Sequence, residues 1–251
     1  MYTMNQEGNA LVYRWDGEVL SIMPWGENSF RVRSTVLGEV EDTDWALLPQ
    51  EETSAEIHVE EYTARITNGK ITAELTVDSW SHSCDIAFYN QKGELLLKEA
   101  GKGGALDKKN RFFKPIIGGD YRLTVTFASN PKEKLYGMGQ YQQDILNVKN
   151  CNLELAHRNS QASVPFVLSD LGYGFLWHNP AIGRASFGRN LMEWSAESTK
   201  QMDYWICAGD TPRDIERQYA DAVGHAPEMP EYGLGFWQCK LRYQTQEELL
   251  S

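Results

Sequence analysis

Apolar and polar side chains alternate with a period of two along much of the chain. In residues 29–34, 62–67 and 71–77 the apolar side chains occupy every second position, as in a strand with one face in a core and the other in water. Turn signals separate such segments, and Asp16-Gly17 and Asn68-Gly69 are both typical of tight β-hairpins. Further strands are predicted at 12–15, 18–23, 84–89, 94–98, 121–127, 166–169, 174–178, 184–187, 191–195 and 202–207.

This spacing predicts a mainly β protein with a large antiparallel β-sandwich, because so many strands without intervening helices exceed a small immunoglobulin-size domain. One helix is expected after the strands. Thr211 is suited to cap it, Pro212 fits its first position, where a missing N–H costs nothing, and Gly224 ends it. Two prolines in residues 225–230 then favour an extended linker. We therefore place the sandwich domain at 1–224 and a linker at 225–230.

Residues 231–251 have a different pattern. Large aromatic and basic residues occur together in 232–243, which is predicted to be a strand. Thr245 and Glu248 then form a capping box, in which each side chain is expected to bind the backbone N–H of the other residue. Because an isolated helix needs about 12–15 residues to be even marginally stable, we expect 231–251 to be the first strand and helix start of a second, truncated domain.

Composition excludes several classes of partner. With 251 residues, a formal net charge of −11 and 41% hydrophobic residues, the chain is typical of soluble globular proteins. The negative charge argues against nucleic acid or an anionic membrane as partner. The local basic residues Lys108, Lys109, Arg111 and Lys114 are expected to be solvated. No apolar run approaches the roughly 18 residues of a membrane span, and no signal peptide is apparent, so we expect a cytoplasmic protein.

The sequence gives no reason to expect a metal or another cofactor. Its five histidines show no HxH or HxxxH spacing, and Gly137-Met-Gly139 is only a GxG with no helix behind it. Those glycines are better explained by a close backbone approach in a strand. The four cysteines form no CxxC pair and are expected to be free, buried thiols. The carboxylates of residues 39–44 are interpreted as a solvated surface run.

Two polar clusters are candidate binding sites. Residues 157–161 form a polar loop between two strand-like segments, and they could equally be plain surface. The predicted strand 232–243 becomes polar towards its end, where Lys240 and Arg242 share a face. In a βα barrel, active sites are built at that end of the strands. The chain also has eight tryptophans, whose faces pack well on sugar rings, although most are expected to fill the core.

Several segments resemble glycoside hydrolase family 31, the α-glucosidases and α-xylosidases. Residues 231–249 look like the entry into the catalytic barrel of that family. Leu-Tyr-Gly-Met-Gly-Gln at 135–140, Gly-Tyr-Gly-Phe-Leu-Trp-His-Asn at 172–179 and Gly-Asp-Thr-Pro-Arg-Asp at 209–214 resemble the segments that precede it. The similarity is dense from about residue 119 onward, and earlier residues are only compatible with it.

The resemblance implies a galactose mutarotase-like sandwich in front of a (β/α)₈ barrel. It also implies a retaining α-glycosidase with two catalytic aspartates, which lie in later barrel motifs that this chain does not contain. The segment alone is therefore expected to be inactive, with an oligosaccharide or α-glycoside substrate and the missing barrel as its partners. A sandwich loop of the family helps shape the sugar pocket. By that match Arg158 and Asn159 are the first candidates for substrate binding, followed by Trp237 and Lys240.

Two other functions stay open. A free-standing carbohydrate-binding module would explain the aromatic-rich strands without any hydrolase activity. A mutarotase that uses the sandwich alone would need an acid and a base in one cleft, for which His157 and His178 are candidates.

Overall fold

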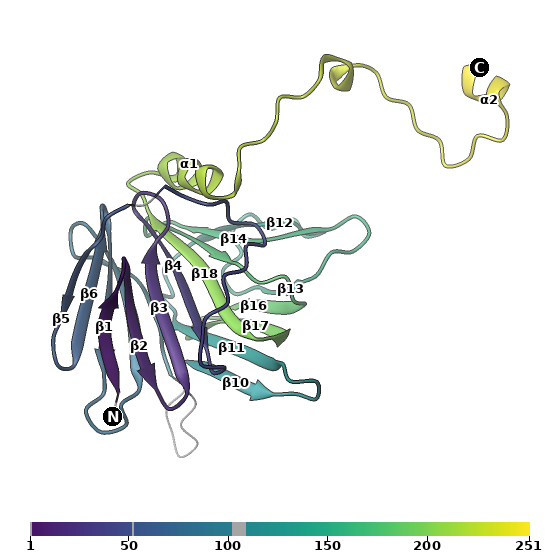
Figure 1. Cartoon of the computed structure of the whole chain (residues 1–251). Coiled ribbons are helices and arrows are strands. Elements are labelled where there is room, and N and C mark those ends of the chain that lie inside the picture. Colours follow the sequence, from purple (N-terminus) through teal and green to yellow (C-terminus); the bar gives the residue numbers. More distant parts are fainter. Residues whose placement is uncertain (1, 52, 102–108) are drawn as a thin grey trace.

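The computed structural model describes residues 2–51, 53–101 and 109–251 (Figure 1). Lys108, one of the basic residues expected to be solvated, lies outside the described residues. Within these ranges the structure contains eighteen strands, two α-helices and one 3₁₀-helix. The strands are β1 (Thr3–Glu7), β2 (Ala10–Trp15), β3 (Glu18–Pro24), β4 (Ser29–Thr35), β5 (Glu56–Val59), β6 (Thr63–Asn68), β7 (Ile71–Val77), β8 (Cys84–Asn90), β9 (Leu95–Lys98), β10 (Arg111–Pro115), β11 (Tyr121–Ala128), β12 (Leu135–Gln140), β13 (Asn152–Leu155), β14 (Ala162–Ser169), β15 (Tyr173–Trp177), β16 (Gly183–Phe187), β17 (Leu191–Thr199) and β18 (Gln201–Ala208).

The strands of the described residues form three antiparallel sheets. One has eight strands in the order β1-β2-β3-β4-β18-β15-β14-β12, and two have five strands, β10-β11-β17-β16-β13 and β5-β6-β7-β8-β9. A bridge between Glu99 and Phe127 links the two smaller sheets. All three contribute to one hydrophobic core, for example through Ile22, Ile86 and Val125. The predicted antiparallel sandwich is confirmed, with three sheets in place of the two expected.

The period-two pattern correctly identified the two faces of β7, but it is wrong for β4, where every residue is buried and neither face lies in water. In β7 the residues Ile71, Ala73, Leu75 and Val77 are all buried, and the residues between them are more exposed. The strand β18 behaves differently, because each of its residues is buried. It lies in the middle of the eight-stranded sheet, and its second face is also covered, by a smaller apolar cluster that includes residues of the first helix.

The helix α1 (Pro212–Val223) begins and ends where the sequence predicts. The hydroxyl of Thr211 accepts the N–H of Asp214, and the Asp214 carboxylate accepts the N–H of Thr211, which completes a capping box. Gly224 follows the helix with a φ of +106°, a conformation that favours glycine. Ile215 is buried against the outer face of the eight-stranded sheet, so α1 is fixed there as a cover.

The glycines of β12 allow a close approach between strands. A Cβ atom on Gly137 would lie 2.7 Å from the carbonyl oxygen of Phe166, and one on Gly139 would lie 2.3 Å from that of Ala162. Both glycines have positive φ angles, and the register of β12 against β14 shifts between them. The prediction that they serve backbone packing is confirmed.

The predicted strand at 232–243 does not form. Residues Glu231–Leu234 are the 3₁₀-helix η1, and residues 235–245 contain no strand. A strand needs a neighbour to accept its backbone hydrogen bonds, and Figure 1 shows this part of the chain running away from the sandwich. The division at 1–224, 225–230 and 231–251 stays a prediction.

The last helix, α2 (Gln246–Leu250), begins at the predicted cap. The Thr245 hydroxyl accepts the N–H of Glu248 at 3.2 Å. The second half of the predicted box is wrong, because the Glu248 carboxylate accepts the N–H of Gln244 and binds the ammonium group of Lys240. The carboxylate therefore stabilises the turn before the helix and leaves the N–H of Thr245 without that bond.

Cys84 and Cys207 are buried free thiols, as expected, but Cys151 is half-buried and Cys239 is exposed. No helix among the described residues is long and apolar enough to cross a lipid bilayer.

The prediction that Arg111 is solvated is wrong, because this arginine is buried. It connects the three sheets. Arg111 of β10 donates from Nε to Glu18 of β3 at 2.6 Å and from Nη2 to the carbonyl oxygen of Cys84 in β8 at 2.9 Å. Its third partner is the carboxylate of Glu99, just after β9. Burial raises the pKa of Glu99 to about 7, although the charge of Arg111 opposes the rise.

Replacement of Glu99 should change how stability depends on pH. The pKa of Glu99 is higher in the folded than in the unfolded protein, so between about pH 4.5 and 7 the folded state binds more protons. Its stabilising contribution is present at low pH and is lost as the pH rises through this window, by up to about 3 kcal/mol. In Glu99→Gln the free energy of unfolding, measured in urea at several pH values, should fall less across the window. Glu39→Gln, at an exposed site, is the control, and an unchanged slope in Glu99→Gln would contradict the assignment.

Candidate functional site

Arg158 and Asn159, the first two predicted binding residues, lie on the loop 156–161, which crosses from one sheet to another. It joins β13 of a five-stranded sheet to β14 of the eight-stranded sheet, at an end of the sandwich. Within it Arg158 and Gln161 form an isolated β-bridge, and Ser160 has a φ of +64°. The loop is therefore a tight turn with a defined backbone.

Arg158 and Asn159 both lie at the exposed tip of this turn. The guanidinium of Arg158 donates to Glu154 through Nε at 2.9 Å and through Nη2 at 2.5 Å. This pair is exposed, so it orients the arginine more than it stabilises the fold. The amide of Asn159 has no hydrogen-bond partner within the described ranges. Both side chains could donate hydrogen bonds to a ligand.

Trp237 and Lys240 lie elsewhere, in the segment that runs away from the sandwich. The indole of Trp237 is 71% exposed and donates to the carbonyl oxygen of Gly233 at 3.1 Å. Lys240 pairs with Glu248 and lies 5.7 Å from the ring centre of Tyr243. The structure does not bring these two residues together with Arg158 and Asn159. Their role in substrate binding stays a prediction.

A hollow of about 550 Å³ lies beside the base of the 156–161 loop. Trp45 and Ala46 form one wall, residues 155–157 and 163–165 another, and residues 176–182 a third. Tyr219 of α1 completes the lining. His157 faces this hollow, and its Nδ1 accepts the N–H of Ser163 at 3.3 Å, which places the ring proton on Nε2.

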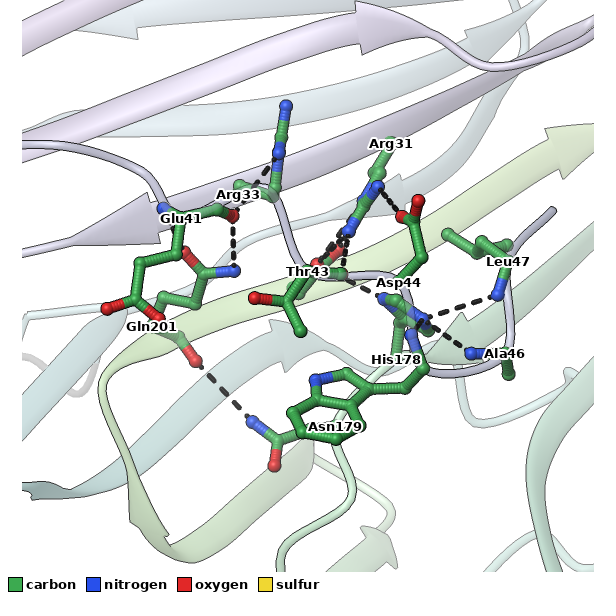
Figure 2. A network of polar contacts seen from close by, with 12 residues as sticks. Arg31, Arg33, Glu41, Thr43, Asp44, Ala46, Leu47, His178, Asn179 and Gln201 are labelled. Atoms are coloured by element: carbon green, nitrogen blue, oxygen red, sulfur yellow. Dashed lines mark hydrogen bonds and ion pairs between the residues drawn. The ribbon is translucent and has the colours of Figure 1, made fainter. Parts of the chain in front are cut away.

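The wall that carries Trp45 is held by a buried ionic network (Figure 2). Arg31 of β4 has no solvent exposure and pairs with Asp203 of β18 at 2.8 Å. The same guanidinium donates to the Asp44 carboxylate at 2.7 Å and to the carbonyl oxygen of Thr43 at 2.6 Å. The long loop after β4 is therefore attached to the centre of the eight-stranded sheet by a buried charge.

His178 binds the next residues of that loop. Its Nε2 accepts the backbone N–H groups of Trp45 at 3.1 Å, Ala46 at 3.0 Å and Leu47 at 3.4 Å. The ring proton is then on Nδ1, which lies 3.1 Å from the Asp203 carboxylate but at an angle too poor for a hydrogen bond. That contact is electrostatic. Because its acceptor nitrogen Nε2 already binds three backbone N–H groups, His178 is not free to act as the base of a mutarotase, although it lines the same hollow as His157.

The carboxylates of residues 39–44 are exposed, as interpreted from the sequence, but two of them also bind arginines of β4. Asp44 binds Arg31, and Asp42 binds Arg33 at 2.8 Å. Part of this network has a signal in the sequence, because Asp203 is a charged residue inside the largely apolar strand β18. A charge at such a position requires partners. Arg31 and Arg33 occupy the polar positions of an alternating segment and give no such signal. Which partners these charges find cannot be read from the sequence, since they lie up to 172 residues away.

The described residues contain no group of three or more His, Cys, Asp or Glu side chains that could hold a metal ion.

A family model, the glycosyl hydrolase 31 N-terminal galactose mutarotase-like domain, matches residues 19–184. The chain belongs to glycoside hydrolase family 31. It is 49% identical over its whole length to an uncharacterized family 31 glucosidase of Pseudescherichia vulneris, of which it covers 50%. It is 31% identical to an alpha-xylosidase of Saccharolobus solfataricus, and this match covers 73% of the chain and 26% of that protein.

Solved structures of the family have the same fold. A family 31 alpha-xylosidase from a soil metagenome, complexed with xylose, superposes on 99% of the chain with a TM-score of 0.91 at 49% identity. A xylosidase from Aspergillus niger superposes on 96% of it with a TM-score of 0.81 at 26% identity. The chain covers 38% and 36% of these two structures. The sandwich is thus the N-terminal domain of family 31 xylosidase- and glucosidase-like enzymes, and the chain spans half or less of these relatives' length.

Replacement of His178 should release the loop that carries Trp45. In His178→Phe three backbone N–H groups lose their acceptor, which should cost about 1–3 kcal/mol of unfolding free energy. Hydrogen exchange at the amides of Trp45, Ala46 and Leu47 should become roughly tenfold faster or more. His58→Phe is a matched control, because His58 is exposed on β5. Unchanged exchange at all three amides would contradict the proposed role of the imidazole.

Proposed function

We propose that this chain is the amino-terminal part of a retaining α-glycosidase that hydrolyses terminal α-xylosides or α-glucosides. The observation that carries this proposal is the extent of the match to the metagenomic alpha-xylosidase and the Pseudescherichia glucosidase, which reaches across almost the whole chain. A shared fold alone would be a weak argument for function. About half of the residues are identical as well, in a match that extends over the whole chain and so takes in the segments that lead from the sandwich towards the catalytic barrel of the family.

The proposed chemistry belongs mainly to the part of the enzyme that follows the sandwich. Retaining hydrolysis uses two carboxyl groups about 5–5.5 Å apart, one as nucleophile and the other as acid and base. The resemblance assigns both to aspartates in later barrel motifs, which this sequence lacks. We therefore expect the 251-residue chain to frame and rim the active site and to hydrolyse nothing alone.

Arg158 and Asn159 are proposed to contact the substrate from the sandwich side. Both are exposed donors on a tight turn, and Glu154 holds the guanidinium of Arg158 in one orientation. A positioned guanidinium can bind two neighbouring hydroxyl groups of a sugar through parallel N–H donors. Trp237 and Lys240 are proposed to contribute an aromatic face and an ammonium group at the start of the barrel.

A cytoplasmic location is proposed with this function. The free thiols of Cys84 and Cys207 are compatible with a reducing compartment.

The proposal predicts a stereochemical outcome. The protein expressed from the complete reading frame should release sugar from p-nitrophenyl α-xyloside or α-glucoside, and ¹H NMR should show the α-anomer first. The 251-residue chain, assayed in parallel, should give the rate of buffer. Release of the β-anomer first would exclude retention, and hydrolysis by the short chain would exclude the assignment of the catalytic groups.

The role of Arg158 can be tested in the same protein. Arg158→Ala should lower kcat/KM about tenfold, because a loss of about 1.4 kcal/mol is typical when a hydrogen bond to substrate is removed. Arg65→Ala is a matched control, since Arg65 also carries an exposed ion pair, with Glu74 in another sheet. Equal kinetic constants for the wild type and both variants would exclude Arg158 from the substrate site.

A further inference from the structure

We propose that the hollow between Trp45, His157 and Tyr219 is a binding subsite for a neutral saccharide, with the indole of Trp45 as its stacking platform. This inference rests on the proposed function, because it assumes that the protein encounters sugars. It concerns a site other than the exposed tip of the 156–161 loop, where Arg158 and Asn159 lie.

The walls of the hollow carry no Lys, Arg, Asp or Glu side chain. This is notable in a chain with 24 basic and 35 acidic residues. A phosphate, a carboxylate or a metal ion would require charged partners in such a site. Apolar groups dominate the lining, and its volume of about 550 Å³ is within the usual range for small-molecule sites. The uncharged, mainly apolar lining of the hollow therefore favours a neutral ligand with an apolar surface.

Trp45 is presented to solvent on a backbone that is unusually well fixed. Its indole is 62% exposed. The two residues before it are bound by Arg31, and its own N–H is bound by His178. An exposed aromatic ring on a fixed backbone loses little conformational entropy when it binds a ligand. The indole can therefore stack against the apolar face of a sugar ring at low cost.

Two donors in the hollow are suited to sugar hydroxyl groups. The ring proton of His157 is on Nε2, because Nδ1 accepts the N–H of Ser163. The ring of Tyr219 is stacked on Phe166 with the centres 4.0 Å apart, so its position is fixed. Burial raises the pKa of Tyr219, which keeps its hydroxyl protonated. In contrast, the amide of Asn179 is already bonded to Thr199.

The same apolar walls could instead be covered by another polypeptide. Two of the exposed residues there, Val164 and Ile182, would suit such a contact. A saccharide is favoured because a protein contact would not require an anchored, exposed indole beside two free donors. The experiment below separates the two occupants.

The test is a titration of the 251-residue chain with D-xylose, isoprimeverose and maltose, followed by the indole N–H signals in ¹H–¹⁵N NMR spectra. At least one of these sugars should shift the Trp45 signal saturably, with a Kd of about 1–10 mM. Glucuronic acid should bind at least about tenfold more weakly than glucose, with both titrated in the same way, because no cation lines the hollow. Comparison of Trp45→Ala with the wild type assigns the signal.

The matched variants are Trp45→Ala and Trp80→Ala. Both remove an exposed indole, and Trp80 is 93% exposed in a different loop. Saturable binding should be lost in Trp45→Ala and kept in Trp80→Ala, and His157→Gln should weaken it several-fold. Unchanged binding in Trp45→Ala would overturn the proposal. So would a Trp45 signal that responds to protein concentration and not to sugar, which would show a second copy on this face.

The sugar titration and the hydrolysis assay can each fail without the other, so a failure of the subsite is distinguished from a failure of the proposed function. Retaining hydrolysis by the complete protein without sugar binding at Trp45 would reject the subsite and keep the enzyme. Binding at Trp45 without hydrolysis by the complete protein would reject the enzyme and support a carbohydrate-binding module.

Discussion

The arrangement on the outer face of the eight-stranded sheet depends on the contacts of one buried carboxylate, that of Asp203, with Arg31 and His178. A buried charge is tolerated only when partners compensate its lost hydration. Asp203 has two partners, the guanidinium of Arg31 and the imidazole of His178. Arg31 in turn binds the loop that follows β4 and lies 4.6 Å from the ring centre of Trp25. One buried anion thereby fixes the side chains of Arg31 and His178. Through them it holds the long loop after β4, whose described residues form no strand.

This anchored loop and α1 cover the same face of the sheet together. Leu47 belongs to the apolar cluster beneath α1, and the N–H of Leu48 donates to the carbonyl oxygen of Ala222 at the end of the helix, at 2.8 Å. Trp45 lies on the same loop, beside the hollow that Tyr219 of α1 also lines. The loop after β4, held by the ionic contacts of Arg31, and the helix α1, held by apolar packing, thus meet on one face of the sheet without closing completely. The hollow is the space that remains beside them.

A second buried network has a different role, because Arg111 connects the three sheets to one another. In both networks an arginine satisfies carboxylates and a backbone carbonyl at once, which suits its planar set of donors. Such ionic groups add little net stability compared with apolar packing, but a broken one is costly. They specify which segments lie side by side. The family 31 sandwich thus combines a conventional apolar core with ionic connections at places where loops or sheets must be joined in one arrangement.

The local features of this protein follow from its amino-acid sequence. The alternation of apolar residues identified strands such as β7, and Thr211 and Gly224 marked the ends of α1, because period and capping depend on neighbours in sequence. Short motifs also indicated the family, which the comparisons confirmed. Only the tertiary structure decided that residues 235–245 form no strand, since pairing needs a distant partner. It also decided that Asp203, His178 and the loop at Trp45 form one site. The bonds from His178 to the loop and from Arg31 to Asp203 join residues 131 to 172 positions apart. Contacts at that range follow from the packing of sheets and not from any local pattern.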